Sequence, residues 1–297
     1  MKMNQGDMER EAERFGDAIA EYLEPYVGVP KDYKWKMRKG VPKQAQKLGL
    51  IAMDNDGGVL ATNKLRTDVA KKAQEIHSMP RETRQSKMKE LCEFVICKWG
   101  ALESNKDDTI ASYACIYTST AIKNLSDVRS LAELRAQAKC NFPFKGIASW
   151  SKWLNFVWPE WALIYDARIA FALNAIHVIK GVNAGAFPVP AGRDKLLSSL
   201  DTQSLAALGY LNRQRKRIPD VPNGEYVDTL ADWLKSGTIA EEDVYEFYLM
   251  VMARVRDMIG HMRFRAFVDS EMLLFYLSNR ELLHDFLSLA TPIDDPA

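Results

Sequence analysis

The chain has 297 residues, of which 47% are hydrophobic and 27% charged, and this composition predicts a packed globular protein and excludes wholesale disorder. The formal net charge of +1 excludes overall basicity as a basis for nucleic-acid binding, so any such surface must be local. No apolar run is long enough to cross a bilayer, and the N-terminal segment is charged from its first residues, so we expect a cytoplasmic protein without membrane contact.

In the N-terminal half, apolar residues recur at helical spacing twice. The first stripe predicts a helix that ends at Gly28 and Pro30, and the second predicts a helix shortly before residue 100. The stripes consist of Ala12, Phe15, Ile19, Tyr22, Leu23 and Tyr26, and of Met88, Leu91, Cys92, Val95 and Trp99. Strand-like alternation is weak, and only residues 50–62 predict a short hairpin, around Gly57 and Gly58.

The segment 144–173 has the most informative order of residues. It begins with a turn at Lys145 and Gly146, and an aromatic helix is predicted from Lys152 to Val157, which Pro159 breaks. An apolar run then reaches Asp166, which stands where the N-cap of a further helix belongs. The segment therefore predicts two helices joined by a compact connection, with Lys152 opening the first and Asp166 opening the second.

The C-terminal half is also predicted to be helical. Irregular stretches at 181–192 and 219–224 are either loops of one domain or the seam between two helical lobes. Asp269 and Ser270 are predicted N-caps for the apolar segment 272–277. A further helical stripe consists of Val244, Phe247, Tyr248, Val251, Val255, Met258 and Ile259. We therefore predict a mainly α fold, either as a single helical unit over 1–297 or as two lobes with the active site between them.

Two local clusters of positive charge interrupt this near-neutral sequence. The segment 31–47 holds seven basic residues and one acidic residue, with Tyr33 and Trp35 among them. The second cluster consists of Arg213, Arg215, Lys216 and Arg217. Basic residues mixed with aromatic ones suit a phosphate backbone and its bases. Each cluster is equally compatible with a solvated loop, so neither decides the function.

Cysteine and histidine residues are scattered along the chain. The cysteines form no C-x-x-C pair, and no two histidines share a ligand spacing on a helix. We therefore expect neither a metal nor another cofactor, and we expect the cysteines to be buried as small apolar residues. They are Cys92, Cys97, Cys115 and Cys140.

The sequence FKGIASWSKWLNFVWPEWALIYDARIAFAL at 144–173 resembles the helix-hairpin-helix DNA glycosylase superfamily, in particular the branch similar to 8-oxoguanine DNA glycosylase. In that family a hairpin leads into a helix opened by a nucleophilic lysine, and an aspartate opens the next helix. The resemblance implies that Lys152 and Asp166 are the catalytic pair. It also implies DNA contacts, expected at Lys145, Gly146, Ser149, Trp150, Ser151 and Arg168. The four-cysteine iron–sulfur loop of some relatives has no counterpart here.

The implied activity is excision of a damaged or modified base from double-stranded DNA, by cleavage of the N-glycosidic bond. Positive charge develops on the deoxyribose as the base leaves, and Asp166 is expected to stabilise it. Lys152, as a neutral amine favoured by surrounding aromatic side chains, is expected to attack the sugar and form a Schiff base, which permits AP-lyase activity. The alternative, that Lys152 only orients the sugar, is left open. The flipped base needs an aromatic pocket, for which the candidates are Trp153, Trp158 and Tyr165.

Each of these residues also has a structural interpretation. Asp166 alone is compatible with a plain helix cap, Lys152 with a solvated lysine, and the tryptophans with core packing. Arg168 is compatible with an ion pair to Glu160 or Asp166. Three other functions also fit: a defence glycosylase that removes modified bases from viral DNA, a non-catalytic DNA-binding protein, and a helical protein-interaction module. We expect a monomer whose partner is duplex DNA with a flipped base.

Overall fold

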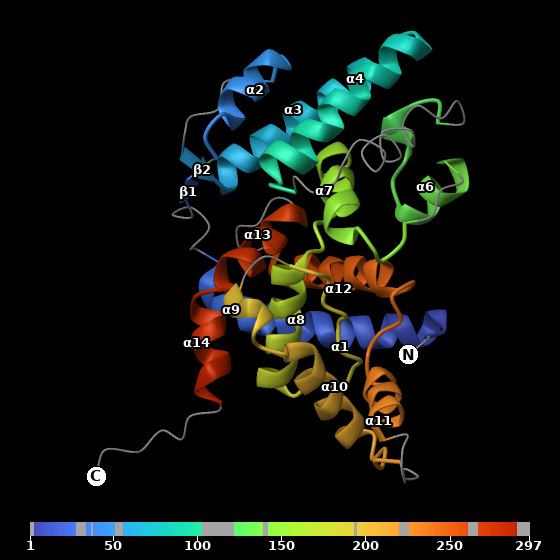
Figure 1. Cartoon of the computed structure of the whole chain (residues 1–297), viewed down its shortest axis with the longest axis vertical. Coiled ribbons are helices and arrows are strands. Elements are labelled where there is room, and N and C mark those ends of the chain that lie inside the picture. The colour runs from blue at the N-terminus through green and yellow to red at the C-terminus, as the bar shows by residue number, and fades with distance from the viewer. Residues whose placement is uncertain are drawn as a thin grey trace. The chain divides into compact units, whose positions relative to one another are not determined.

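A computed structural model describes residues 3–27, 34–36, 38–50, 56–102, 122–138, 142–192, 195–219, 226–260 and 267–289. These residues are mainly helical and include a small antiparallel sheet, so the prediction of a mainly α protein is confirmed (Figure 1). The chain forms two compact units. Unit 1 comprises Met1–Gly28, Asp166–Arg265 and Ser270–Ala297, and unit 2 comprises Val29–Tyr165 and Ala266–Asp269. The boundary between Tyr165 and Asp166 therefore divides the segment that resembles the glycosylases.

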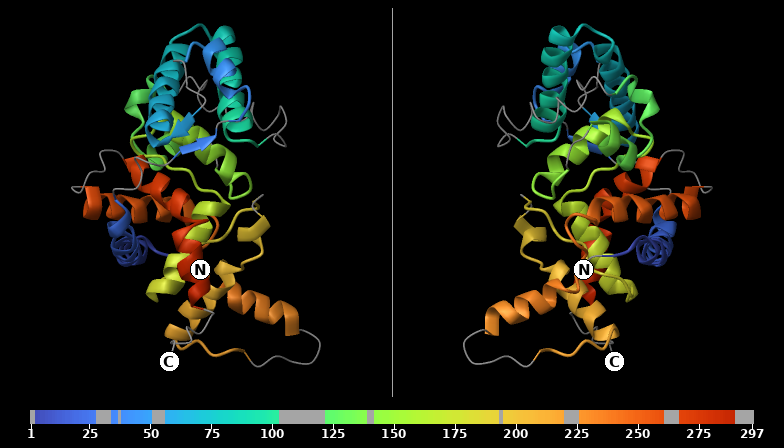
Figure 2. Two further views of the ribbon diagram at one scale, coloured as in Figure 1. Left: turned by 90° about the vertical axis from the view of Figure 1, so that its left-hand side faces the viewer. Right: turned by 90° about the vertical axis from the view of Figure 1, so that its right-hand side faces the viewer.

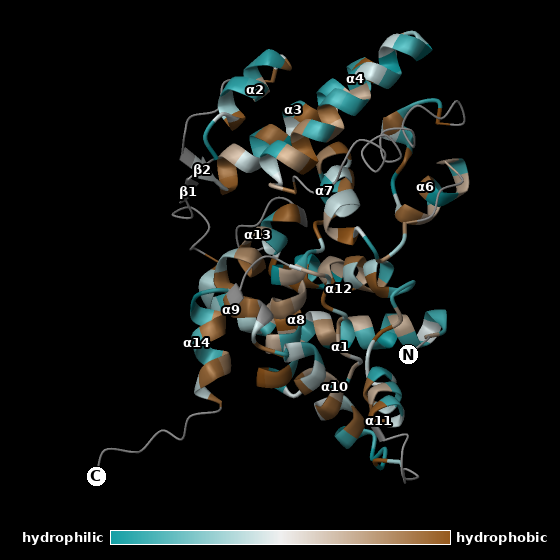
Figure 3. Cartoon of the chain, in the orientation of Figure 1, coloured by the Kyte–Doolittle hydropathy of each residue, from teal (hydrophilic) through white to brown (hydrophobic). Residues whose placement is uncertain are grey.

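Unit 1 is built around helix α8, which is buried over most of its length. Helices α10 and α14 pack against α8, and α1 packs against α12 (Figure 2). The helices of this unit are α1 (Gln5–Leu23), α8 (Ala167–Lys180), α9 (Lys195–Ser198), α10 (Thr202–Arg213), α11 (Tyr226–Lys235), α12 (Val244–Ile259), most of α13 (Phe267–Leu277) and α14 (Glu281–Ser288). Helix α14 alternates between hydrophobic and hydrophilic residues, and its Leu282, Leu283 and Phe286 are buried (Figure 3).

The contact between α1 and α12 joins two of the predicted apolar stripes. Most residues of both stripes are buried, whereas Met258 is 40% exposed. Gly16 permits the close approach of the two helices, because a Cβ at this position would lie 2.5 Å from the Cγ of Arg254. Beside it, Asp17 accepts a hydrogen bond of 2.6 Å from the Nε of Arg254. The predicted helix stop at Gly28 and Pro30 lies outside the described residues.

Unit 2 combines helices with the small sheet. Its elements are β1 (Lys34–Lys36), α2 (Val41–Lys47), β2 (Asp56–Gly58), α3 (Val59–His77), α4 (Arg81–Glu93), a π-helical turn (Phe94–Trp99), a 3-10 turn (Leu125–Asp127), α6 (Leu131–Ala138) and α7 (Ile147–Val157). Helix α3 packs against both α4 and α7. The second predicted stripe continues from α4 into the π-helical turn, and Cys92 and Cys97 are buried there as expected. Cys115 and Cys140 lie outside the described residues.

Two local predictions are wrong. Gly57 and Gly58 do not turn a hairpin, because they lie in β2, which pairs antiparallel with β1, and α3 begins directly afterwards. Asp269 and Ser270 do not precede α13, because the helix already begins at Phe267. Asp269 instead accepts a hydrogen bond of 2.7 Å from the Nδ2 of Asn63 within unit 2.

None of the helices within the described ranges has the length and apolar character to cross a bilayer.

Candidate active site

Helix α7 begins earlier than predicted. Its N-cap is Gly146, with a φ of 90°, and its first residue is Ile147. A left-handed backbone favours glycine, so Gly146 fixes the turn, and the residues that follow continue without a break into the helix. Lys152 therefore does not open the helix but lies in its second turn, which corrects the prediction.

The residues predicted as a DNA-binding hairpin, Ser149, Trp150 and Ser151, are part of α7. All three are buried, with exposed fractions of 3%, 1% and 0%. The indole Nε1 of Trp150 donates a hydrogen bond of 2.8 Å to the carbonyl of Pro143. Packed helical residues cannot present a backbone loop to DNA, so the assignment of these three to a hairpin is wrong. The two residues directly before α7, Lys145 and Gly146, are exposed.

Lys152 is buried in unit 2, with an exposed fraction of 7%. Its Nζ donates a hydrogen bond of 3.2 Å to the carbonyl of Ala148, one turn earlier in α7. Its aliphatic stem lies close to Gly100, where an added Cβ would be 3.0 Å from the Cδ of Lys152. Lys152 is therefore buried, and the alternative that it is a solvated lysine is wrong.

The connection after α7 is attached to that helix by two polar side chains. The Oγ of Ser151 accepts a hydrogen bond of 3.0 Å from the N–H of Tyr165 and lies 3.3 Å from its carbonyl oxygen, to which it donates. One turn later, the Nδ2 of Asn155 donates a hydrogen bond of 2.7 Å to the carbonyl of Ala162. Ser151 directly precedes Lys152 and Tyr165 directly precedes Asp166. The clamp made by Ser151 thus joins the two chain positions from which the candidate catalytic residues follow.

Asp166 is the N-cap of α8 in unit 1, which confirms that prediction. Its Oδ1 accepts hydrogen bonds from the N–H groups of Arg168 (3.1 Å) and Ile169 (3.2 Å). Arg168 places its guanidinium 4.5 Å from the ring centroid of Phe275, within the same unit. This is a cation–π contact, and the DNA contact implied for Arg168 stays a prediction.

The candidate base-pocket residues lie in packed surroundings. Trp153 and Tyr165 are fully buried and Trp158 is 3% exposed, with its Nε1 donating a hydrogen bond of 2.7 Å to the carbonyl of Leu125. Burial raises the pKa of the Tyr165 hydroxyl well above its usual range, so it stays protonated at neutral pH. The role of these three residues in a base pocket stays a prediction.

Two cavities lie away from the candidate catalytic residues. One, of about 280 Å³ in unit 2, is lined by Lys47, Lys72, Lys87, Glu90 and neighbouring apolar residues. The other, of about 460 Å³ in unit 1, is lined by Pro188, by residues of α10 and α11, and by the connection 238–242 that precedes α12. Within the described ranges, no three histidine, cysteine or acidic side chains are grouped to hold a metal ion.

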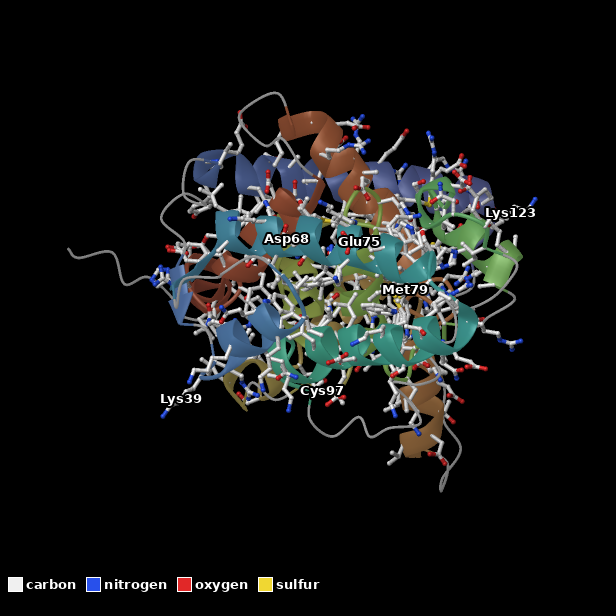
Figure 4. The ribbon with its side chains drawn as sticks, turned by 90° about the horizontal axis from the view of Figure 1, so that it is seen from above. Lys39, Asp68, Glu75, Met79, Cys97 and Lys123 are labelled. Atoms are coloured by element: carbon white, nitrogen blue, oxygen red, sulfur yellow. The ribbon has the colours of Figure 1, made fainter. Side chains whose placement is uncertain are left out.

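The first basic cluster is described in part. Arg38, Lys39, Lys43 and Lys47 are exposed, and Lys39 projects away from the ribbon (Figure 4). In the second cluster all four basic residues are exposed.

Comparison with protein-family models, with curated proteins and with solved structures finds no match to this chain. Any function must therefore be inferred from the residues themselves.

Replacement of Ser151 by alanine should destabilise unit 2 by about 1–3 kcal/mol, because a buried N–H and a buried carbonyl of Tyr165 both lose this hydroxyl. Urea unfolding measures the change. Ser78→Ala is the matched control, since the exposed Ser78 hydroxyl donates to the Gln74 carbonyl at the surface of the same unit. The control should stay within about 0.5 kcal/mol of the wild type. Equal losses of unfolding free energy in Ser151→Ala and Ser78→Ala would contradict a stabilising clamp of Ser151 on Tyr165.

Proposed function

We propose that this protein is a DNA N-glycosylase that removes a damaged or modified base, with Asp166 stabilising the sugar cation and Lys152 acting as the nucleophile. The observation that carries the proposal is the clamp of Ser151 on Tyr165. It ties together the positions that precede the two residues, in the order helix, compact connection and aspartate-capped helix. The resemblance of 144–173 to the helix-hairpin-helix glycosylases implies the same order.

The chemistry follows from the two side chains. The carboxylate of Asp166, at the N-terminus of α8, is favoured as an anion by the helix dipole and can stabilise positive charge on the deoxyribose. The Nζ of Lys152, once deprotonated, can form a bond to the anomeric carbon while the bond to the base breaks and its electron pair leaves with the base. Opening of the sugar then gives a Schiff base, from which β-elimination cleaves the strand.

DNA is proposed to meet this site through the turn before α7. Lys145 and Gly146 are both exposed, and Gly146 has no side chain to keep a phosphate from the backbone. This shorter turn replaces the hairpin in the proposal. Base extrusion from the duplex remains a requirement of the chemistry, because the glycosidic bond must reach both side chains.

The test is a base-release screen across duplexes that carry oxidised, deaminated, alkylated or virally modified bases. Release from lesions alone supports repair, and release from viral modifications alone supports defence. Borohydride should trap a covalent complex with the wild type and not with Lys152→Gln. Lys145→Gln, which removes an exposed lysine seven residues earlier, should weaken DNA binding and still be trapped at saturating protein.

Three results contradict parts of the proposal. Base release without a trapped complex would leave Lys152 as an orienting residue and Asp166 as the sole catalytic group. DNA binding without base release from any substrate would favour the non-catalytic DNA-binding protein. Absence of DNA affinity even at low salt would favour the protein-interaction module.

A further inference from the structure

Helix α10 ends in a basic turn, 213–217, in which Arg215 has a left-handed backbone with a φ of 52°. The N–H of Arg215 donates to the carbonyl of Asn212 at 2.9 Å, and the N–H of Lys216 donates to the carbonyl of Leu211 at 3.0 Å. This pair of hydrogen bonds is a Schellman cap, and its left-handed residue is usually glycine. An arginine at this position is strained, because its Cβ crowds the backbone where glycine has none.

The neighbouring helix α8 ends with the same cap made by glycine. Gly181 has a φ of 60°, its N–H donates to the carbonyl of Val178 at 3.3 Å, and the N–H of Val182 donates to the carbonyl of His177 at 3.1 Å. Within the described ranges, the one other non-glycine residue with positive φ is Ala101. Helix termination therefore does not require an arginine at position 215.

Among the contacts within the described ranges, one cation of the basic turn has a structural role and the other three have none. Arg213 donates a hydrogen bond of 2.6 Å from its guanidinium to the carbonyl of Val182. Arg215, Lys216 and Arg217 are exposed, and no acidic side chain in the described part of the chain forms an ion pair with them. Three like charges on successive residues repel one another, which opposes their clustering in the folded protein.

The helix dipole does not account for this arrangement. Cations are favoured at a helix C-terminus, but the effect falls off beyond the last turn. Arg213 already occupies the last turn of α10, whereas Arg215, Lys216 and Arg217 lie beyond it. Strain at Arg215, together with charge that no described acidic side chain pairs with, is the pattern expected of a binding site, where a strained backbone serves recognition.

We propose that the basic turn binds the sugar–phosphate backbone of duplex DNA, as a contact in addition to the candidate active site. A guanidinium donates two parallel hydrogen bonds to phosphate oxygens, and three of the four cations here are arginines. A duplex carries one negative charge for about every 1.7 Å of its axis, which matches closely spaced cations. The choice of DNA among polyanions rests on the proposed function, whereas the strain and the charge of the turn do not.

Arg215→Gly separates stability from binding, because the two should change in opposite directions. Relief of the strain should raise the melting temperature by about 2–4 °C. Affinity for a labelled duplex without lesions should fall, and the slope of log K against log salt should become shallower by about 1, as one phosphate contact is lost. The triple variant Arg215→Gly, Lys216→Gln, Arg217→Gln should lose about 3 from the slope.

Lys123→Gln is the control for net charge, since Lys123 is exposed and projects away from the ribbon (Figure 4). It should keep the wild-type slope. The proposal is overturned if Arg215→Gly keeps the wild-type affinity and slope, or if it fails to raise the melting temperature. Binding of the wild type to phosphatidylserine vesicles and not to the duplex would overturn the choice of DNA. Failure of the proposed glycosylase activity is distinguishable from failure of the DNA contact. In the first case the wild type would release no base but would still show the duplex affinity that Arg215→Gly weakens.

Discussion

Asp166→Asn should lower the rate of base release by a factor of about 10²–10³ while leaving DNA affinity close to that of the wild type. The substitution removes the charge that stabilises the sugar cation but keeps an oxygen that can accept the N–H groups of Arg168 and Ile169. Asparagine is as good an N-cap as aspartate, so α8 should remain formed. Loss of the favourable interaction with the helix dipole should cost only about 0.3–1 kcal/mol. Single-turnover rates at saturating protein and urea unfolding measure the two effects.

Asp201→Asn provides the matched control. Asp201 is the N-cap of α10, and its Oδ1 accepts a hydrogen bond of 3.0 Å from the N–H of Ser204. The two substitutions make the same chemical change at the same kind of position in unit 1. Asp201→Asn should match Asp166→Asn in stability and the wild type in base release. If both variants lose activity equally, or if Asp166→Asn stays within tenfold of the wild type, the catalytic role of Asp166 is wrong.

The features that the sequence predicts well are those set by neighbouring residues. The apolar stripes of α1, α4 and α12 follow from helical spacing alone. Asp166 was identified as an N-cap because its hydrogen bonds reach only two and three residues along the chain. The position of Asp166 at the start of α8 can thus be predicted from the local sequence.

The features that the sequence does not predict depend on residues far apart. β1 and β2 pair across some twenty residues of chain, so the two glycines of β2 look like a turn when considered alone. Ser151 bonds to Tyr165, fourteen residues later, whereas its assignment to a hairpin rests on the resemblance to the glycosylases alone. A signal for its true role was present: Ser151 and Asn155 are polar, four residues apart and surrounded by apolar residues. On a buried helix, two polar side chains one turn apart need hydrogen-bond partners from another part of the chain.

His177 shows how a residue that looks unremarkable in the sequence can govern the stability of unit 1. It lies in α8 with no exposed surface, its Nε2–H donates a hydrogen bond of 2.7 Å to the carbonyl of Ala184, and its ring is 5.6 Å from that of Phe15. In the described part of the chain, its buried Nδ1 has no hydrogen-bond partner. Desolvation by burial, aided by the charge of Arg213 and opposed by the bond to Ala184, lowers the pKa of His177 to about 4.

Acidification should therefore destabilise unit 1 through His177. Its pKa is 6.5 in the unfolded chain and about 4 in the folded chain. Between these two pH values the unfolded state therefore binds a proton that the folded state does not. The stability contributed by neutral His177 is full above pH 6.5 and is lost as the pH falls toward 4. The shift corresponds to about 3 kcal/mol at the acidic end of this window. Urea unfolding at a series of pH values measures it.

His177→Gln isolates this contribution from that of the carboxylates. The amide nitrogen of glutamine is as many bonds from the backbone as Nε2 of histidine, so it can donate to Ala184 without titrating. The variant should lose about 2–3 kcal/mol less stability than the wild type between about pH 7.5 and 4.5. His284→Gln, whose side chain is 82% exposed in the wild type, should follow the wild-type profile. Parallel profiles for the wild type and His177→Gln would show that His177 is not the group that titrates.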